Sequence, residues 1–249
     1  MTENVPRRID EQALRTFGSI FLDPSVGCTE LRVFKATKKN GFIVRKQSKW
    51  PEVYAGWFDD VNALVVEASR LRDISGYCTL NPVSRDLLKL SEESRNKLVW
   101  VKSATVDKQI TCLRWLYVDI DPVRPPDISS TDDELQAALS RRDAILGDHP
   151  EMLASSLWGC SGNGAFLWVR LPDYPNDAAH KKLIARTLTA LSSRYSDRVV
   201  EIDVKTKNPS RVGPLVGSWK TKGENTPERP WRLVTLDSPI NGHGWGVAS

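Results

Sequence analysis

Residues 113–120, LRWLYVDI, form a nearly continuous apolar run that contains β-branched and aromatic side chains. A short run of this composition is typical of a buried central strand. Asp121 and Pro122 follow it and open a proline-rich loop, VRPPDISS. The run therefore predicts a central strand that ends at two carboxylates, Asp119 and Asp121.

Helices and strands are both indicated around this strand. The predicted helices span residues 9–22, 59–73, about 130–146 and a segment after Asn176 or Asp177. The first rests on its apolar spacing, and the other three begin at a residue that can act as a cap. The other predicted strands are bounded by turn signals: a hairpin at 30–46 around Asn40-Gly41, then 74–80, two strands within 153–171, 198–204 and 231–236. This order predicts the fold class α+β, or mixed α/β, rather than a pure dinucleotide-binding unit. Neither G-x-G-x-x-G nor G-x-x-x-x-G-K-[ST] occurs, so both of those nucleotide-binding motifs are excluded.

The composition is that of an ordinary globular protein of 249 residues, enough for one large or two small domains. The net charge of +4 permits a nucleic-acid partner without requiring one. The four cysteines are far apart, and none has zinc-site spacing. The first ten residues are polar and no stretch is long and apolar enough to cross a bilayer, so we expect a cytoplasmic protein with no membrane partner.

Asp119 and Asp121 are the first candidates for chemistry. Side chains at positions i and i+2 of a strand point to the same side, so the two carboxylates project together. Neighbouring carboxylates repel each other unless a cation neutralises them, and oxygen ligands suit Mg²⁺ or Mn²⁺. The alternative is that D-x-D-P simply leaves a strand through a turn.

Three later segments have the composition of a phosphate-binding site. Residues 161–164, SGNG, can turn backbone N–H groups toward an anion, although a plain hairpin turn is the alternative. Asp203 ends a further strand, where Glu201 shares its face and is an alternative ligand. Residues 208–211, NPSR, and 217–223, GSWKTKG, combine basic side chains, hydroxyls and glycines, and a solvated loop is the alternative.

Six basic residues decorate the predicted hairpin: Arg32, Lys35, Lys38, Lys39, Arg45 and Lys46. They indicate either a solvated surface or a contact surface for a DNA backbone.

The order of these motifs resembles the archaeo-eukaryotic primase superfamily, especially its bacterial, phage and plasmid primase-polymerases. The stretches that carry the resemblance are CTLNPV at 78–83, WLYVDIDPVRPPDISSTDDE at 115–134, SGNGAFLWVRLP at 161–172 and the late Lys222-Gly223. The resemblance covers most of residues 30–235. It implies one primase-polymerase-like domain over residues 1–249. An N-terminal α/β module at about 25–112 would share a sheet with an RRM-like catalytic module at about 113–237.

The resemblance also implies site residues and partners. Asp119, Asp121 and Asp203 would hold two divalent ions, Mg²⁺ or Mn²⁺. The nucleotide-binding positions would be Ser161, Gly162, Asn163, Phe166, Arg211, Lys220 and Lys222. The expected partners are nucleoside triphosphates, single-stranded or primer-template DNA and a replicative helicase.

The implied function is a DNA primase or polymerase that adds nucleotides to a 3′-hydroxyl by two-metal catalysis. The family carries a phosphate-binding histidine where this chain has Phe166, and phenylalanine has no hydrogen-bond donor. The alternative is therefore a weakened or inactive primase-like module that binds nucleotide or DNA. A metal-dependent nuclease would use the same carboxylates, but the order of the motifs does not favour it.

Overall fold

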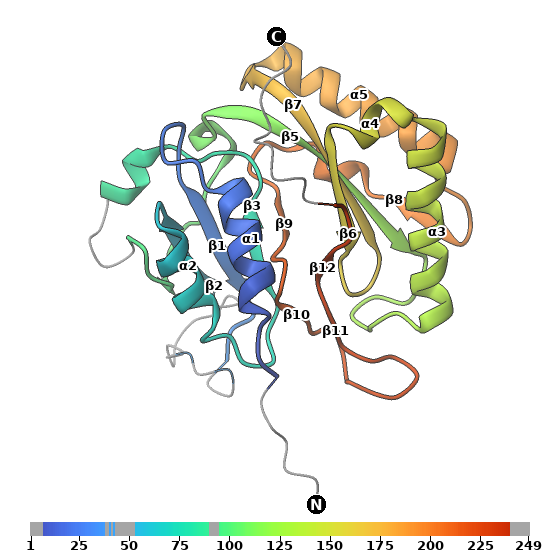
Figure 1. Ribbon diagram of the computed structural model, residues 1–249, viewed down its shortest axis with the longest axis horizontal. Helices are drawn as coiled ribbons and strands as arrows, with labels where there is room; N and C mark the ends of the chain where they lie inside the picture. Colours follow the sequence, from blue (N-terminus) through green and yellow to red (C-terminus); the bar gives the residue numbers. More distant parts are fainter. Residues whose placement is uncertain (1–6, 38–39, 41, 43–52, 90–94, 240–249) are drawn as a thin grey trace, which may run out of the picture.

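The computed structural model of the chain describes residues 7–37, 40, 42, 53–89 and 95–239 and contains two antiparallel five-stranded sheets (Figure 1). Helices and strands are both present and the sheets are antiparallel, so the predicted class α+β is confirmed. Within the described part of the chain, no helix has the length and apolar character needed to cross a membrane.

The first sheet has the strand order β4-β2-β1-β3-β9. Its strands are β1 (Thr29–Phe34), β2 (Val53–Phe58), β3 (Gly76–Thr79), β4 (Val99–Trp100) and β9 (Val212–Pro214). Leu31 and Val33 of β1 are fully buried, in the same core as the apolar side chains of α1 (Glu11–Phe21) and α2 (Val61–Ala68). Arg32 and Phe34 alternate with them and point to the opposite face of the sheet.

The predicted hairpin at 30–46 is wrong in its strand pairing. β1 is confirmed as a strand, but its two neighbours in the sheet are β2 and β3. Phe34 pairs with Val53, so both edges of β1 are occupied without residues 42–46. Gly41 and residues 43–46 lie outside the described residues.

The second sheet has the order β12-β6-β7-β5-β8. Its main elements follow one another as β5 (Cys112–Pro122), α3 (Asp132–Asp148), β6 (Ser156–Cys160), β7 (Ala165–Pro175), α5 (Ala178–Tyr195) and β8 (Val200–Ile202). This β-α-β-β-α-β order, with β5 and β7 central, is the split βαβ arrangement of ferredoxin-like sheets. The helix caps follow the sequence signals, because Thr131 and Glu134 form a capping box on α3 and Asp177 caps α5.

The two faces of β5 have different neighbours. Leu116, Val118 and Ile120 belong to the core formed with α3 and α5, which lie on the side of the second sheet away from the first (Figure 1). Trp115 and Tyr117 belong to the core formed with α1 and the first sheet. Asp119 and Asp121 continue this second face by alternation, so the strand directs both acids toward the junction between the sheets.

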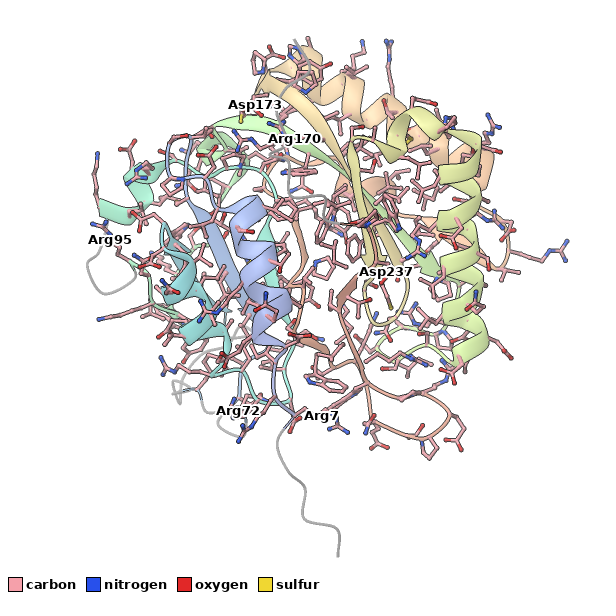
Figure 2. The ribbon with its side chains drawn as sticks, viewed as in Figure 1. Arg7, Arg72, Arg95, Arg170, Asp173 and Asp237 are labelled. Atoms are coloured by element: carbon pink, nitrogen blue, oxygen red, sulfur yellow. The ribbon has the colours of Figure 1, made fainter. Side chains whose placement is uncertain are left out.

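Aromatic and polar contacts join the two halves. Phe21 of α1 packs 4.9 Å from the ring of Trp115, and Phe17 packs 5.9 Å from Trp168. Arg170 and Asp173 lie together on β7 (Figure 2), and Asp173 also pairs with Arg114 of β5, whose guanidinium reaches Asp23 after α1 at 3.1 Å. Because β9 completes the first sheet from residues 212–214, the two halves are interleaved in sequence, and the module boundary near residue 112 stays a prediction.

The remaining elements are short: η2 (Arg85–Lys89), η3 (Asp107–Gln109), α4 (Pro150–Leu153), η4 (Val204–Lys207), β10 (Trp219–Lys220), β11 (Arg232–Leu233) and β12 (Thr235–Leu236). The predicted last strand at 231–236 is therefore divided. β11 pairs with β10, whereas β12 pairs with β6 in the second sheet. β10 lies beside the turn at residues 161–164, because an added Cβ at Gly162 would come within 2.5 Å of Lys220. Lys220 lines the same cavity as Asp119 and Asp121 at the end of β5.

Candidate functional site

A cavity of about 390 Å³ opens between the two sheets at the C-terminal end of β5. The predicted site residues that line it are Asp119, Asp121, Ser161, Asn163, Arg211, Lys220 and Lys222. Other lining residues come from the first sheet and the segment before β9, namely Arg32, Phe34, Tyr77, Asn208, Ser210, Val212 and Pro214. Tyr117 of β5 and Arg124 in the loop after β5 complete the lining. The lining thus contains five cationic and two anionic side chains, a balance that suits a polyanionic ligand.

Asp119 and Asp121 form a crowded carboxylate pair. Burial raises the pKa of Asp119 to about 7, with the negative charge of Asp121 as the second cause and Lys220 acting in the opposite direction. Arg124 lies 3.7 Å from Asp121 and is held by the carbonyl oxygens of Pro122 and Ile128. Repulsion between two acids is what a bound divalent cation removes, so this pair fits Mg²⁺ or Mn²⁺.

The backbone of Asp203 is hydrogen-bonded to the backbone of Asp119, and its side chain has other partners. Its N–H donates to the carbonyl oxygen of Asp119 at 3.0 Å. One carboxylate oxygen accepts from Arg211 at 3.1 Å, and the other caps η4 by accepting from the N–H of Lys205 at 2.8 Å. Among the described residues, no three His, Cys, Asp or Glu side chains converge to hold a metal ion. The negative charge of Asp203 also acts on Asp119, so its role as a third metal ligand stays a prediction.

The turn at residues 161–164 offers hydrogen-bond donors to the cavity. The Oγ of Ser161 accepts from the N–H of Gly164 at 3.0 Å and closes the turn. Asn163 is only 1% exposed, and its Oδ1 accepts from the N–H of Ser130. Its Nδ2 has no hydrogen-bond partner among the described residues. A buried donor without a partner is costly unless a ligand satisfies it, so Asn163 fits a ligand that carries oxygen atoms.

The cationic side chains have fixed positions. Arg211 is held by Asp203, and the N–H of Ser210 beside it donates to Asp107 at 3.1 Å. Lys220 donates from Nζ to the hydroxyl of Tyr77 at 3.0 Å. Burial alone lowers the pKa of Lys220, but Tyr77 and then the two cavity acids outweigh it, so the net pKa is raised and the ammonium stays charged.

Phe166 does not line the cavity, which corrects its predicted role in nucleotide binding. It is fully buried and pairs with Asp119 in the sheet register. Its ring stacks on Trp168 at 4.1 Å and lies against Gly159, where an added Cβ would come within 2.7 Å of the ring. The side chain belongs to the core, so its lack of a donor removes nothing from the cavity.

Sequence reasoning missed the polar lining residues Tyr77, Tyr117 and Arg124, and it named Arg32 only as part of a solvated or DNA-contact surface. Arg32 and Tyr77 lie opposite each other in the β1–β3 register. Arg32 is oriented by the fully buried Glu30, which accepts two hydrogen bonds from its guanidinium at 3.1 and 2.5 Å. Alternation along β1 predicts that Arg32 points to the other face of the sheet from the buried Leu31 and Val33. The sequence does not show that this face lines the cavity, because that depends on the pairing of β1 with β3.

Comparisons with known proteins assign no family. No family model matches the chain, and no curated protein matches it. Among solved structures, the chain is similar to the polymerase domain of ligase D from Mycobacterium tuberculosis, which was solved in complex with DNA. The two chains are 13% identical, the match covers 90% of this chain and 79% of that chain, and the TM-score is 0.44.

Proposed function

We propose that the cavity between the sheets is the active site of a nucleotidyl transferase that adds nucleotides to a nucleic-acid 3′-hydroxyl. The observation that carries the proposal is the lining of one cavity by a carboxylate pair and five cationic side chains. A nucleoside triphosphate needs both kinds of group, because its phosphates require cations and its reacting centre requires a metal held by oxygen ligands.

Asp119 and Asp121 would hold a divalent cation, Mg²⁺ or Mn²⁺. Bound there, such an ion supplies positive charge at the transferred phosphate and makes a hydroxyl easier to deprotonate. Arg124 lies 3.7 Å from Asp121 and lines the same cavity. Asp203, whose charge also acts on Asp119, stays the predicted third ligand, and its carboxylate accepts a hydrogen bond from Arg211.

The donors around the cavity would bind the triphosphate. Arg211, Lys220 and Lys222 offer positive charge to phosphate oxygens, and Asn163 offers a buried amide donor. Arg211 and Lys220 are held by Asp203 and Tyr77, so they can stabilise charge that develops on the leaving pyrophosphate without having to reorient. The expected ligands are nucleoside triphosphates and single-stranded or primer-template DNA.

One observation favours a second candidate, a non-catalytic module that binds nucleotide or DNA. Asp203 is paired with Arg211, and the two acids that line the cavity are Asp119 and Asp121. A site with two acids can bind a metal–nucleotide complex and still transfer slowly or not at all.

A primer-extension and de novo priming assay with Mg²⁺ or Mn²⁺ separates the two candidates. We expect synthesis by the wild type and its loss in Asp119→Ala. The exposed acid Asp133 on α3 provides the matched control, because Asp133→Ala removes a carboxylate that does not line the cavity. Binding of triphosphate without synthesis would favour the module, and degradation of DNA would indicate a nuclease. Absence of both binding and synthesis would overturn the proposal.

A further inference from the structure

Tyr77 and Lys220 meet at a wall that two cavities share. A second cavity of about 320 Å³ lies beside the first. Both cavities are lined by Phe34, Tyr77, Lys220 and Lys222. Tyr77 comes from β3 of the first sheet and Lys220 from β10, so their contact joins two elements that are far apart in sequence.

The side chain of Lys220 is confined along its whole length. Its backbone pairs with Arg232 of β11. Its Cβ and Cγ pass over Gly162, where an added Cβ would lie 2.5 Å from the Cβ of Lys220 and where the backbone φ is +88°. At its tip, Nζ donates to the hydroxyl of Tyr77 at 3.0 Å and lies 4.6 Å from the centre of the Tyr77 ring. The ammonium is therefore held at one place in the cavity wall.

The ammonium is near the acids but is not paired with them. The charges of Asp119 and Asp121 act on Lys220, yet neither carboxylate forms an ion pair with it in the part of the chain that the structure describes. In a cavity with low effective dielectric, an untethered ammonium is attracted to a carboxylate more strongly than it is in water. The hydroxyl of Tyr77 provides the tether that prevents this contact.

We propose that Tyr77 is a positioning residue whose hydroxyl holds the Lys220 ammonium apart from Asp119 and Asp121. The ammonium then binds a phosphate group of the ligand, and the carboxylates stay available to a divalent cation. The inference rests on the proposed function and adds to it a residue that keeps the cationic and anionic parts of the site separate.

The variant Tyr77→Phe tests this inference, because it removes the hydroxyl and keeps the ring beneath the ammonium. We expect the affinity for inorganic triphosphate to fall about tenfold, as for loss of a hydrogen bond to a charged group. We also expect the affinity for Mn²⁺ alone to fall about threefold to tenfold, because the released ammonium pairs with the carboxylates. Calorimetry measures the first affinity, and electron paramagnetic resonance of free Mn²⁺ measures the second.

The double variant Tyr77→Phe/Lys220→Met distinguishes positioning from a merely structural role. Without the ammonium, nothing competes for the carboxylates, so the affinity for Mn²⁺ should return at least to the wild-type value. The affinity for triphosphate should stay at the level of Lys220→Met alone. Tyr174→Phe, on β7 and outside both cavity linings, is the matched control and should change neither affinity.

The outcomes separate this inference from the proposed function. Unchanged affinities in Tyr77→Phe, or a loss of Mn²⁺ affinity that persists in the double variant, overturn the role of Tyr77 even where the wild type extends primers. The expected pattern of affinities without primer extension supports the role of Tyr77 and contradicts the transferase. A wild type that binds neither triphosphate nor Mn²⁺ overturns both.

Discussion

Asp119 is the residue at which folding and the candidate function conflict. Burial first, and then Asp121, raises its pKa from 3.8 to about 7. Between those two values the folded protein binds the proton more readily than the unfolded chain does. The free energy of unfolding therefore falls as the pH rises through this interval, and the loss is complete above about pH 7.

The variant Asp119→Asn keeps the shape of the side chain and removes its charge. The free energy of unfolding should then no longer fall as the pH rises from about 4 to about 7. We expect the variant to be more stable than the wild type by about 1–2 kcal/mol at pH 8, with little difference near pH 4. Urea unfolding at the two pH values measures the change. A gain of the same size at both pH values would show that burial and repulsion of the charge are not its cause.

Phe166 leads to a second prediction at the residue scale. Replacement by histidine puts a polar ring into the fully buried stack with Trp168. We expect Phe166→His to cost about 2–4 kcal/mol of unfolding free energy, because the imidazole loses water and finds no partner there. Primer extension should not increase, since the side chain does not line the cavity. An increase in synthesis would mean that a ring at this position reaches the phosphates.

Asn81 connects three elements that shape the cavity. Its Oδ1 accepts from the N–H groups of Arg114 and Trp115, where the register of β5 shifts against β7. Its Nδ2 donates to the carbonyl oxygen of Pro209, in the loop that carries Arg211. One amide thus sets the start of the acid-bearing strand and the position of a cationic side chain.

Asn81→Ala should therefore affect both stability and ligand affinity. We expect a loss of about 2–3 kcal/mol of unfolding free energy, because buried backbone donors lose their acceptor. We also expect weaker binding of triphosphate through displacement of Arg211. Asn62→Ala on α2 is the control, because its contact with Arg15 is exposed and should contribute less than about 0.5 kcal/mol. Equal effects of the two variants would contradict the connecting role of Asn81.

Elements with local signals could be predicted from the sequence, and their pairing could not. Apolar continuity indicates β5, and the cap at Thr131 and Glu134 indicates α3, because both depend on neighbouring residues. The Asn40-Gly41 signal predicts that β1 pairs with the residues just after this turn. In the structure β1 pairs with β2, which starts at Val53, because the pairing of a strand depends on the side chains that pack against it.

The site divides in the same way. Alternation along β5 is sufficient to place Asp119 and Asp121 together. The contact between Tyr77 and Lys220 depends on β3 and β10 lying side by side in the cavity wall. Asp203 is likewise oriented by its ion pair with Arg211. Such contacts between distant segments leave no periodic pattern in the sequence.

For the whole molecule, the cavity lies at the junction of the two sheets, so a ligand there contacts both. Arg32 and Tyr77 come from the first sheet, and Asp119 and Asp121 come from the second. A ligand that bridges them should stabilise both halves together.

We expect Mn²⁺ with a nucleoside triphosphate to raise the melting temperature in a single transition. At a ligand concentration about 100 times the Kd, the stabilisation is about 2.7 kcal/mol. The matching nucleoside without phosphates should have little effect. Calorimetric scanning that resolves two transitions, with only one of them shifted, would contradict binding across both sheets.

The central claim is that the Asp119–Asp121 pair and the cations opposite it form one site for a metal–triphosphate ligand. Calorimetric titration of a nucleoside triphosphate, with and without Mn²⁺, tests this most directly when the wild type is compared with Asp119→Asn/Asp121→Asn. We predict that Mn²⁺ tightens binding to the wild type about tenfold or more and has no such effect on the double variant. Equal affinities with and without Mn²⁺ in the wild type, or the same metal dependence in the double variant, would contradict it.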